Sequence, residues 1–240
     1  MHTNITTPKQ ALSPAFLKQP TSREEIELFK KEFANLLDRI NPKESEEFHK
    51  NLIKDFLNAV YYKDKHYINT KGKTDLVIHN GNDTASSVGV LIETKSPANK
   101  AEMVSLGDRE KGDRKGRPYM NVKSFQELVL YYLRERKTGK NFELRYLIIT
   151  NVYEWFVFDA QDFEKLFYQN KTLLNRFEQF QAGKLSGTST DFFYKEIASP
   201  EIARLTRHSE LVSESPCLQG IAGQARNDDI PFDLRHCKSQ

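Results

Sequence analysis

The stretch Thr74–Pro97, TDLVIHNGNDTASSVGVLIETKSP, decides the fold expected for this chain. It holds two apolar runs separated by the turn-forming sequence GND at 81–83. Such a pattern predicts two strands joined as an antiparallel hairpin. We expect the first strand over 74–80 and the second over 88–95, with Pro97 ending the second.

Three charged residues lie on these two strands, Asp75 on the first and Glu93 and Lys95 on the second. Residues two apart on a strand share a face, so Glu93 and Lys95 point the same way. A hairpin loop centred on Thr84 would place Asp75 opposite Glu93, because the two are equidistant from it. Paired carboxylates are ligands for Mg²⁺, and a lysine beside them orients or activates a nucleophile.

The spacing of an acid and a lysine two residues apart is not specific by itself. It recurs at 113–115 in a polar loop and at 135–137 at the end of a predicted helix, where the two side chains lie on different faces. Only Glu93 and Lys95 lie on an apolar strand that follows another acid-bearing strand. The alternative is an ordinary charge pair at a strand end, but charges at the ends of central strands are costly unless compensated.

Helical and strand patterns extend outward from the hairpin in both directions. Upstream, Ser22 and Glu25 form a capping-box pattern that begins one amphipathic helix, and a second follows Pro42. Downstream, the pattern predicts a helix over 122–133, strands over 144–150 and 154–158, and a helix over 163–180 interrupted near Asn170. This order predicts an α/β fold with a mixed central sheet flanked by helices and an N-terminal helical pair.

Composition changes along the chain divide it into three parts. Residues 1–21 hold three prolines and are expected to form an irregular arm, and residues 22–200 are expected to form the domain. Residues 201–240 contain few periodic apolar residues and are expected to be a poorly structured tail. Both cysteines, Cys217 and Cys237, lie in that tail, so neither a disulfide framework nor a cysteine zinc site is expected to support the domain.

The overall composition excludes several classes of protein. Of the 240 residues, 38% are hydrophobic and 29% charged, which is the composition of a folded chain rather than a disordered one. The net charge is only +3, so any basic surface for nucleic acid must be local. No apolar run approaches the roughly 18–20 residues of a membrane span, and the N-terminus lacks a signal-peptide pattern. We therefore expect a cytoplasmic protein without a membrane segment.

Several stretches resemble the N-terminal PD-(D/E)xK nuclease region of large single-chain, type IIG-like restriction–modification enzymes. The resemblance covers roughly residues 10–180 and implies a restriction-endonuclease-like core. It departs from the name of the motif at Thr74, which stands where that motif has proline. The stretches are KESEEFHKNLIKDFL at 43–57, NTKGKTDLVIHNG at 69–81, VGVLIETKSPANKAEM at 88–103, ELVLYYLRER at 127–136 and LIITNVYEWFVFDA at 147–160.

The resemblance implies a type II restriction-type endonuclease, a phosphodiester hydrolase that cuts double-stranded DNA in defence against foreign DNA. Asp75 and Glu93 would bind Mg²⁺, for which Mn²⁺ would substitute, and Lys95 would assist attack by water. Some relatives add an acid from the helix before the hairpin and a Gln or Glu from the helix after it. Glu47 and Gln126 are the accessory candidates here, with exposed helix faces as the alternative.

Two further groups of polar residues are weaker candidates. The basic side chains of the segment KGDRKGRPYMNVK would contact DNA phosphates, with a solvated loop as the alternative; they are Arg114, Lys115, Arg117 and Lys123. His79 lies four residues beyond Asp75 on the same strand and is either a ligand or base or, as we expect, a surface histidine near the turn.

The chain has no glycine-rich nucleotide-binding loop and no methyltransferase catalytic segment. We therefore expect either a stand-alone nuclease domain or a remnant of a larger enzyme, whose methyltransferase and specificity region would be missing from this chain. Two alternatives stay open: a non-catalytic DNA-binding or interaction module with a degenerate nuclease site, and an α/β protein without a role in nucleic-acid chemistry.

Overall fold

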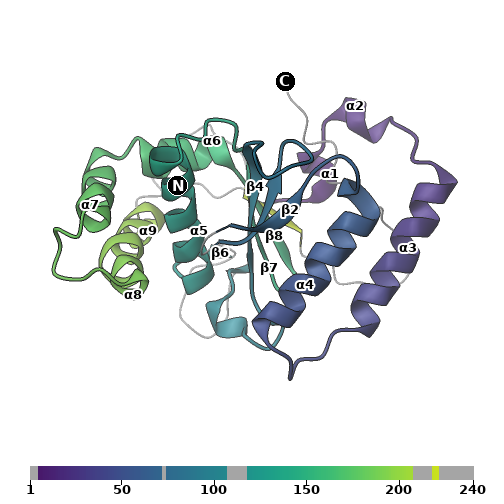
Figure 1. Cartoon of the computed structure of the whole chain (residues 1–240), viewed down its shortest axis with the longest axis horizontal. Coiled ribbons are helices and arrows are strands. Elements are labelled where there is room, and N and C mark those ends of the chain that lie inside the picture. Colours follow the sequence, from purple (N-terminus) through teal and green to yellow (C-terminus); the bar gives the residue numbers. More distant parts are fainter. Residues whose placement is uncertain (1–4, 72–73, 107–117, 208–217, 222–240) are drawn as a thin grey trace.

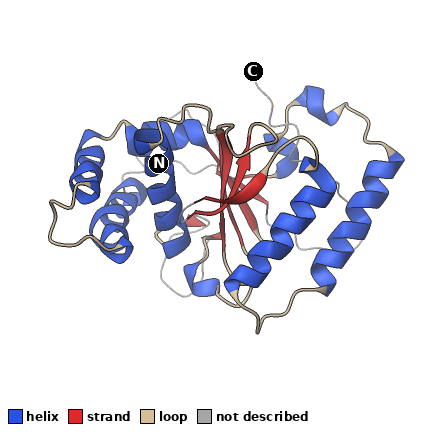
Figure 2. Ribbon diagram, viewed as in Figure 1, coloured by secondary structure: helices blue, strands red, loops and turns tan. Residues whose placement is uncertain are grey.

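A mixed β-sheet forms the middle layer of the protein, and helices cover both of its faces (Figures 1 and 2). The computed structural model describes residues 5–71, 74–106, 118–207 and 218–221. Its described strands form a seven-stranded sheet in the order β1-β9-β8-β7-β4-β3-β2 and a two-stranded sheet, β5-β6. The prediction of an α/β fold with a mixed sheet flanked by helices is confirmed.

The strands are short, and the two longest form the predicted hairpin. The large sheet contains β1 (Ile5–Thr6), β2 (Ile68–Lys71), β3 (Thr74–His79), β4 (Val88–Thr94), β7 (Tyr146–Thr150), β8 (Trp155–Asp159) and β9 (Leu218–Ile221). The small sheet contains β5 (Ser105–Leu106) and β6 (Pro118–Tyr119).

The helices before the hairpin are α1 (Pro8–Ala11), α2 (Pro14–Leu17), α3 (Arg23–Asp38) and α4 (Glu46–Leu57), which continues into the π-helical turn η1 (Asn58–Tyr62). Helices α3 and α4, the predicted N-terminal pair, contact each other, and α4 contacts β3 and β4. The later helical segments are η2 (Lys100–Glu102), α5 (Lys123–Leu133), η3 (Arg134–Thr138), α6 (Ala160–Phe163), η4 (Glu164–Tyr168), α7 (Lys171–Gln181), α8 (Thr190–Phe192), η5 (Phe193–Ala198) and α9 (Ser199–Arg207).

Polar side chains cap the start of α3, as predicted, and the start of α7. The Ser22 hydroxyl accepts from the Glu25 backbone N–H at 3.1 Å and the Glu25 carboxylate accepts from the Ser22 N–H at 3.1 Å, which is the predicted capping box. The interruption expected near Asn170 has the same cause. The Asn170 side-chain oxygen accepts from the Leu173 backbone N–H at 3.1 Å, so Asn170 caps the start of α7.

The hairpin register is the predicted one. Leu76 pairs with Ile92 and Ile78 with Val90, and this register sets Asp75 opposite Glu93. On its other side β4 runs parallel to β7, reached through helix α5, so β4 is a central strand. The end of β4 therefore lies inside the sheet rather than at an edge.

Alternation along these strands sends apolar side chains into two cores. One core packs Leu76 and Ile92 against α3 and α4, where Ile53 is fully buried. The other packs Val77 and Leu91 against α5 and the helices that follow it. Figure 1 shows these layers, with α3 and α4 on one side of the sheet and α5, α7 and α9 on the other. Burial on both faces explains why these strands are apolar throughout.

Helices and strands occur on both sides of the two expected boundaries, at residues 21–22 and 200–201. The arm expected over 1–21 includes β1, α1 and α2, and the boundary expected at residue 200 falls inside α9, whose Ile202 is buried. Residues 218–221 of the expected tail pair with β8. Cys217 and Cys237 lie outside the described residues. Across the part of the chain that the structure describes, no helix has both the length and the apolar character required to cross a membrane.

The packing of α4 on the sheet generates a test of the fold. Ile53→Ala removes a fully buried side chain between α4 and β3–β4 and is expected to lower the free energy of unfolding by about 2–5 kcal/mol. Asp55→Ala, on the exposed face of the same helix, is expected to change it by less than about 0.5 kcal/mol. Urea denaturation followed by circular dichroism measures both, and equal effects would contradict this packing.

Candidate functional site

The three charged residues predicted from the hairpin meet at the end of β4. The Lys95 ammonium donates to Glu93 Oε1 at 2.6 Å, and both side chains are buried. Asp75 is anchored from the neighbouring strand, because its Oδ2 accepts from the Thr94 backbone N–H at 2.9 Å and from the Thr94 hydroxyl at 2.8 Å. The shared face of Glu93 and Lys95 is thus as the strand period predicts.

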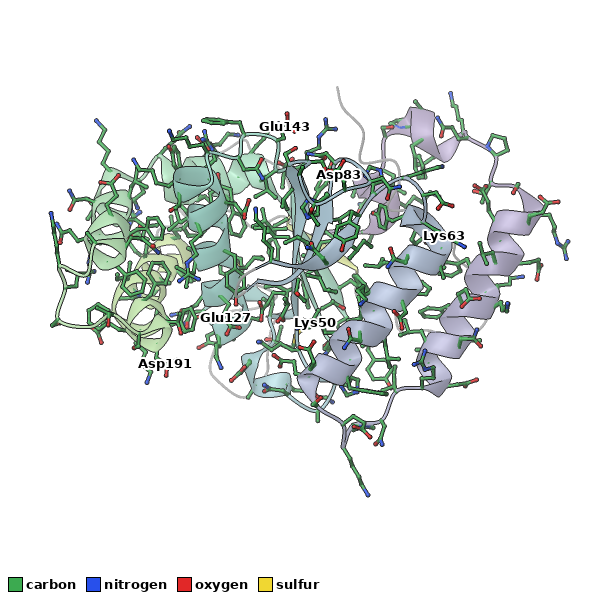
Figure 3. The ribbon with its side chains drawn as sticks, in the orientation of Figure 1. Lys50, Lys63, Asp83, Glu127, Glu143 and Asp191 are labelled. Atoms are coloured by element: carbon green, nitrogen blue, oxygen red, sulfur yellow. The ribbon has the colours of Figure 1, made fainter. Side chains whose placement is uncertain are left out.

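Three acids that the sequence analysis did not identify complete the cluster around Lys95. Glu127 of α5 has Oε2 at 2.8 Å from Lys95 Nζ, and Glu46 of α4 has Oε1 at 3.4 Å. A third acid, Glu102 of η2, lies at 3.9 Å. Figure 3 labels Glu127 and Lys50, which come from the helices on opposite sides of the sheet and lie toward the same end of it. Both helical layers therefore contribute to one site.

The accessory candidates Glu47 and Gln126 contact Lys50 and Asn121 instead of Lys95. Glu47 is exposed and pairs with Lys50, and the Gln126 amide donates to the Asn121 side-chain oxygen at 2.9 Å. In each helix the neighbouring residue reaches Lys95 instead, because successive helical side chains are rotated by about 100°.

A signal for the rotation of α4 was present in the sequence. Glu46 lies seven residues before Ile53, an apolar residue of the predicted stripe, so the helical period places it on the buried side of the helix. The structure adds that His49 and Lys50, three and four residues after Glu46, are buried on the same side. Helix α5 offers no such signal, since its described side chains are buried almost all round. The choice of Glu127 over Gln126 therefore depended on how α5 packs.

The weaker candidates divide between described and undescribed residues. Arg114, Lys115 and Arg117 lie outside the described residues, and Lys123 begins α5 with its ammonium 3.4 Å from Glu102 Oε1. The expectation of a surface position for His79 is wrong. Its ring is buried, with Nδ1 2.7 Å from the Ser86 carbonyl and Nε2 3.0 Å from the Asn69 side-chain oxygen, so it ties the hairpin together.

Burial and like charges oppose the ionisation of Glu93. Its burial raises the pKa well above the ordinary value of 4.5, the charges of Asp75 and Glu127 raise it further, and Lys95 opposes them. Burial also raises the pKa of Glu46. Burial by itself would lower the pKa of Lys95, but Glu93 and Glu127 outweigh it and raise that pKa above the ordinary value. The acids around Lys95 thus favour its protonated, charged form while they repel one another.

The donor set fits a hard divalent cation. Glu46, Asp75 and Glu93 each offer a carboxylate oxygen, and these three oxygens lie within 4.8 Å of one another. Oxygen ligands of this kind are those that Mg²⁺ prefers. In addition, Glu93 Oε2 is buried without a hydrogen-bond partner among the described residues. A buried carboxylate oxygen without a partner is rare, and a cation would satisfy it.

The comparison with known families places the chain. One protein family, described as "Domain of unknown function (DUF7149)", matches residues 6–213. The chain belongs to the DUF7149 family. No match was found among curated proteins or among solved structures. The matched range includes Lys95 and the five acids that form the acidic cluster, so the candidate site lies within the DUF7149 domain. These acids are Glu46, Asp75, Glu93, Glu102 and Glu127.

The raised pKa of Glu93 predicts how the stability of the metal-free protein depends on pH. Above about pH 4.5, Glu93 in the folded protein still holds a proton that Glu93 in the unfolded chain has released. The free energy of unfolding therefore decreases as pH rises through this range. Asp75→Asn removes one repelling charge and is expected to make this decline smaller. Asp55→Asn on the exposed face of α4 is the control.

Urea denaturation in EDTA, repeated from about pH 5 to about pH 8, measures the difference between the two variants and the unsubstituted protein. Other groups titrate in this range, so the difference between variants is the quantity that decides. An identical pH dependence in all three proteins would contradict the coupling of Asp75 to Glu93.

Proposed function

We propose that this chain is a Mg²⁺-dependent endodeoxyribonuclease domain with a restriction-endonuclease-like core. The observation that carries the proposal is the convergence of Glu46, Asp75 and Glu93 beside Lys95 at the end of a central strand. The resemblance of the sequence to restriction nucleases, which rests on several stretches besides the three hairpin residues, points to the same chemistry. Double-stranded DNA is the proposed substrate.

The proposed reaction is hydrolysis of a phosphodiester bond. Water attacks phosphorus, one P–O ester bond breaks, and the products are a phosphate monoester and a free hydroxyl. Glu46, Asp75 and Glu93 would hold Mg²⁺ or Mn²⁺, which supplies a lowered pKa for bound water and neutralises charge developing on the phosphate. The anchoring of Asp75 by Thr94 and the burial of Glu93 fix these ligands in place before substrate arrives.

Lys95 acts in this proposal as a proton-bearing cation rather than as a base. Its pKa lies above the ordinary value, so at neutral pH its ammonium has no free electron pair to accept a proton. It is suited to orient the attacking water and to stabilise the negative charge that builds up on the phosphate oxygens. The carboxylates that surround it keep it protonated and fix its position.

A wider setting follows from the same resemblance. We propose that the domain is part or a remnant of a restriction–modification system that acts on foreign DNA. A methyltransferase and specificity region would then be the partner of this domain, because base recognition in such enzymes usually lies in a separate region.

Metal-dependent cleavage of DNA tests this proposal. The purified protein is expected to nick or linearise supercoiled plasmid in Mg²⁺ or Mn²⁺ and to leave it intact in EDTA. Lys95→Ala is expected to lower the cleavage rate by at least about a hundredfold, because a charge that stabilises the transition state is lost, while binding to duplex DNA is retained. Lys137→Ala is the matched control, because Lys137 follows Glu135 with the same spacing and pairs with Glu178 instead.

Each result of that experiment has a consequence. Plasmid that stays intact after long incubation with folded protein in either metal would overturn the nuclease proposal. Salt-sensitive DNA binding without cleavage by either protein would favour the alternative, a non-catalytic DNA-binding module.

Thermal melting tests the metal site independently of activity. Mg²⁺ at ten- to hundredfold excess over its Kd is expected to stabilise the protein by about 1–3 kcal/mol. Asp75→Asn is expected to abolish this stabilisation and cleavage, and to leave the metal-free protein at least as stable, because it removes a repelling charge while an amide oxygen still accepts from Thr94. A wild-type melting temperature that millimolar Mg²⁺ leaves unchanged would exclude the metal site.

A further inference from the structure

A second lysine, Lys50 of α4, reaches the acidic cluster through Asp75. Lys50 lies on the buried stripe of α4, one helical turn after Glu46, and only 10% of its side chain is exposed. Its Nζ contacts the Glu47 carboxylate and lies 3.9 Å from Asp75 Oδ1. That oxygen belongs to the carboxylate whose other oxygen, Oδ2, is anchored by Thr94. Lys50 therefore borders the candidate metal position.

The site carries more acids than Lys95 can neutralise, so a second cation such as Lys50 would help a DNA phosphate to bind there. Among the described residues, the acids within 4 Å of Lys95 Nζ are Glu46, Glu93, Glu102 and Glu127, and Asp75 adds a further acid to the cluster. Lys95 is thus fully engaged by carboxylates and buried. A phosphodiester that approaches this cluster meets excess negative charge, which opposes binding.

Lys50 is held much less firmly than Lys95. Its closest partner, Glu47, has a side chain that is 63% exposed, and ion pairs to exposed carboxylates contribute little to stability. The contact with an exposed carboxylate also shows that the ammonium end of Lys50 lies near the surface while its alkyl stem is buried. Exchange of Glu47 for a phosphate oxygen would therefore cost little.

We propose that Lys50 contacts a phosphate group of the DNA at this site and that Glu47 holds Lys50 in place until DNA binds. The inference rests on the proposed function, since DNA must be the molecule that the site receives. It also assigns a role to Glu47 that differs from metal binding. Glu47 competes with the phosphate for one ammonium group, so it regulates DNA affinity from outside the metal position.

Binding of a fluorescein-labelled DNA duplex, measured by anisotropy in Ca²⁺ at several salt concentrations, tests this inference. Lys50→Gln is expected to weaken binding by about tenfold and to lower the slope of log K against log salt by about 0.9. Lys50→Arg is expected to retain affinity within about twofold, because the positive charge is kept. Lys63→Gln is the matched control, since Lys63 is exposed and lies at the opposite end of the α4–η1 segment (Figure 3).

Glu47 provides the second arm of the experiment. Glu47→Gln is expected to tighten DNA binding, and the double variant Glu47→Gln, Lys50→Gln is expected to bind like Lys50→Gln alone, because Glu47 acts only through Lys50. If Lys50→Gln does not fold, Glu47→Gln and Lys50→Arg decide the matter. An affinity that Glu47→Gln leaves unchanged then overturns the inference.

The outcomes separate this inference from the proposed function. A wild-type protein that cleaves DNA, with equal affinity and salt slope for wild type and Lys50→Gln, overturns the role of Lys50 alone. A wild-type protein that neither binds nor cleaves DNA overturns both. Loss of affinity in Lys50→Gln that Lys50→Arg restores supports the phosphate contact whether or not cleavage is observed.

Discussion

The burial of the Lys95 ammonium among carboxylates at the end of β4 is the interaction on which the rest of the structure depends. An isolated buried charge costs several kcal/mol, so this side chain, 3% exposed, requires partners. Glu93 comes from its own strand, Glu127 from α5 and Glu46 from α4. Because these elements belong to different layers, both helical layers must dock at the same end of the sheet. One charge thereby ties together segments far apart in the sequence.

The excess of negative charge in the same cluster is unfavourable for stability, and it is also what makes the cluster suited to chemistry. More carboxylates gather there than Lys95 can neutralise, and Glu93 keeps one oxygen without a partner among the described residues. A protein interior rarely keeps such an arrangement for stability alone, because apolar side chains of similar volume would serve as well. Perturbed carboxylates at a fixed position are typical of functional sites. The proposed nuclease activity uses this excess of charge to hold a cation.

Membership of the DUF7149 family covers residues 6–213, which include the large sheet from β2 to β8 and both helical layers. The candidate site is therefore a property of the domain and not of the residues that follow it. Lys50 and Glu47 extend the site along α4 toward solvent, where an anionic substrate would first meet the protein. The inner residues are suited to hold a metal and the outer ones to admit a phosphate.

The sequence by itself determined the elements that depend on local physics. Alternating apolar runs and turn residues specified the β3–β4 hairpin and its register, and the Ser22 cap specified where α3 begins. The register was enough to bring Asp75 opposite Glu93. Only the tertiary structure decided that Glu127 joins them, because the rotation of α5, which is buried on most sides, depends on packing and not on its own apolar period. Helix α5 therefore brings Glu127 rather than Gln126 to Lys95, while the apolar stripe of α4 brings Glu46 rather than Glu47.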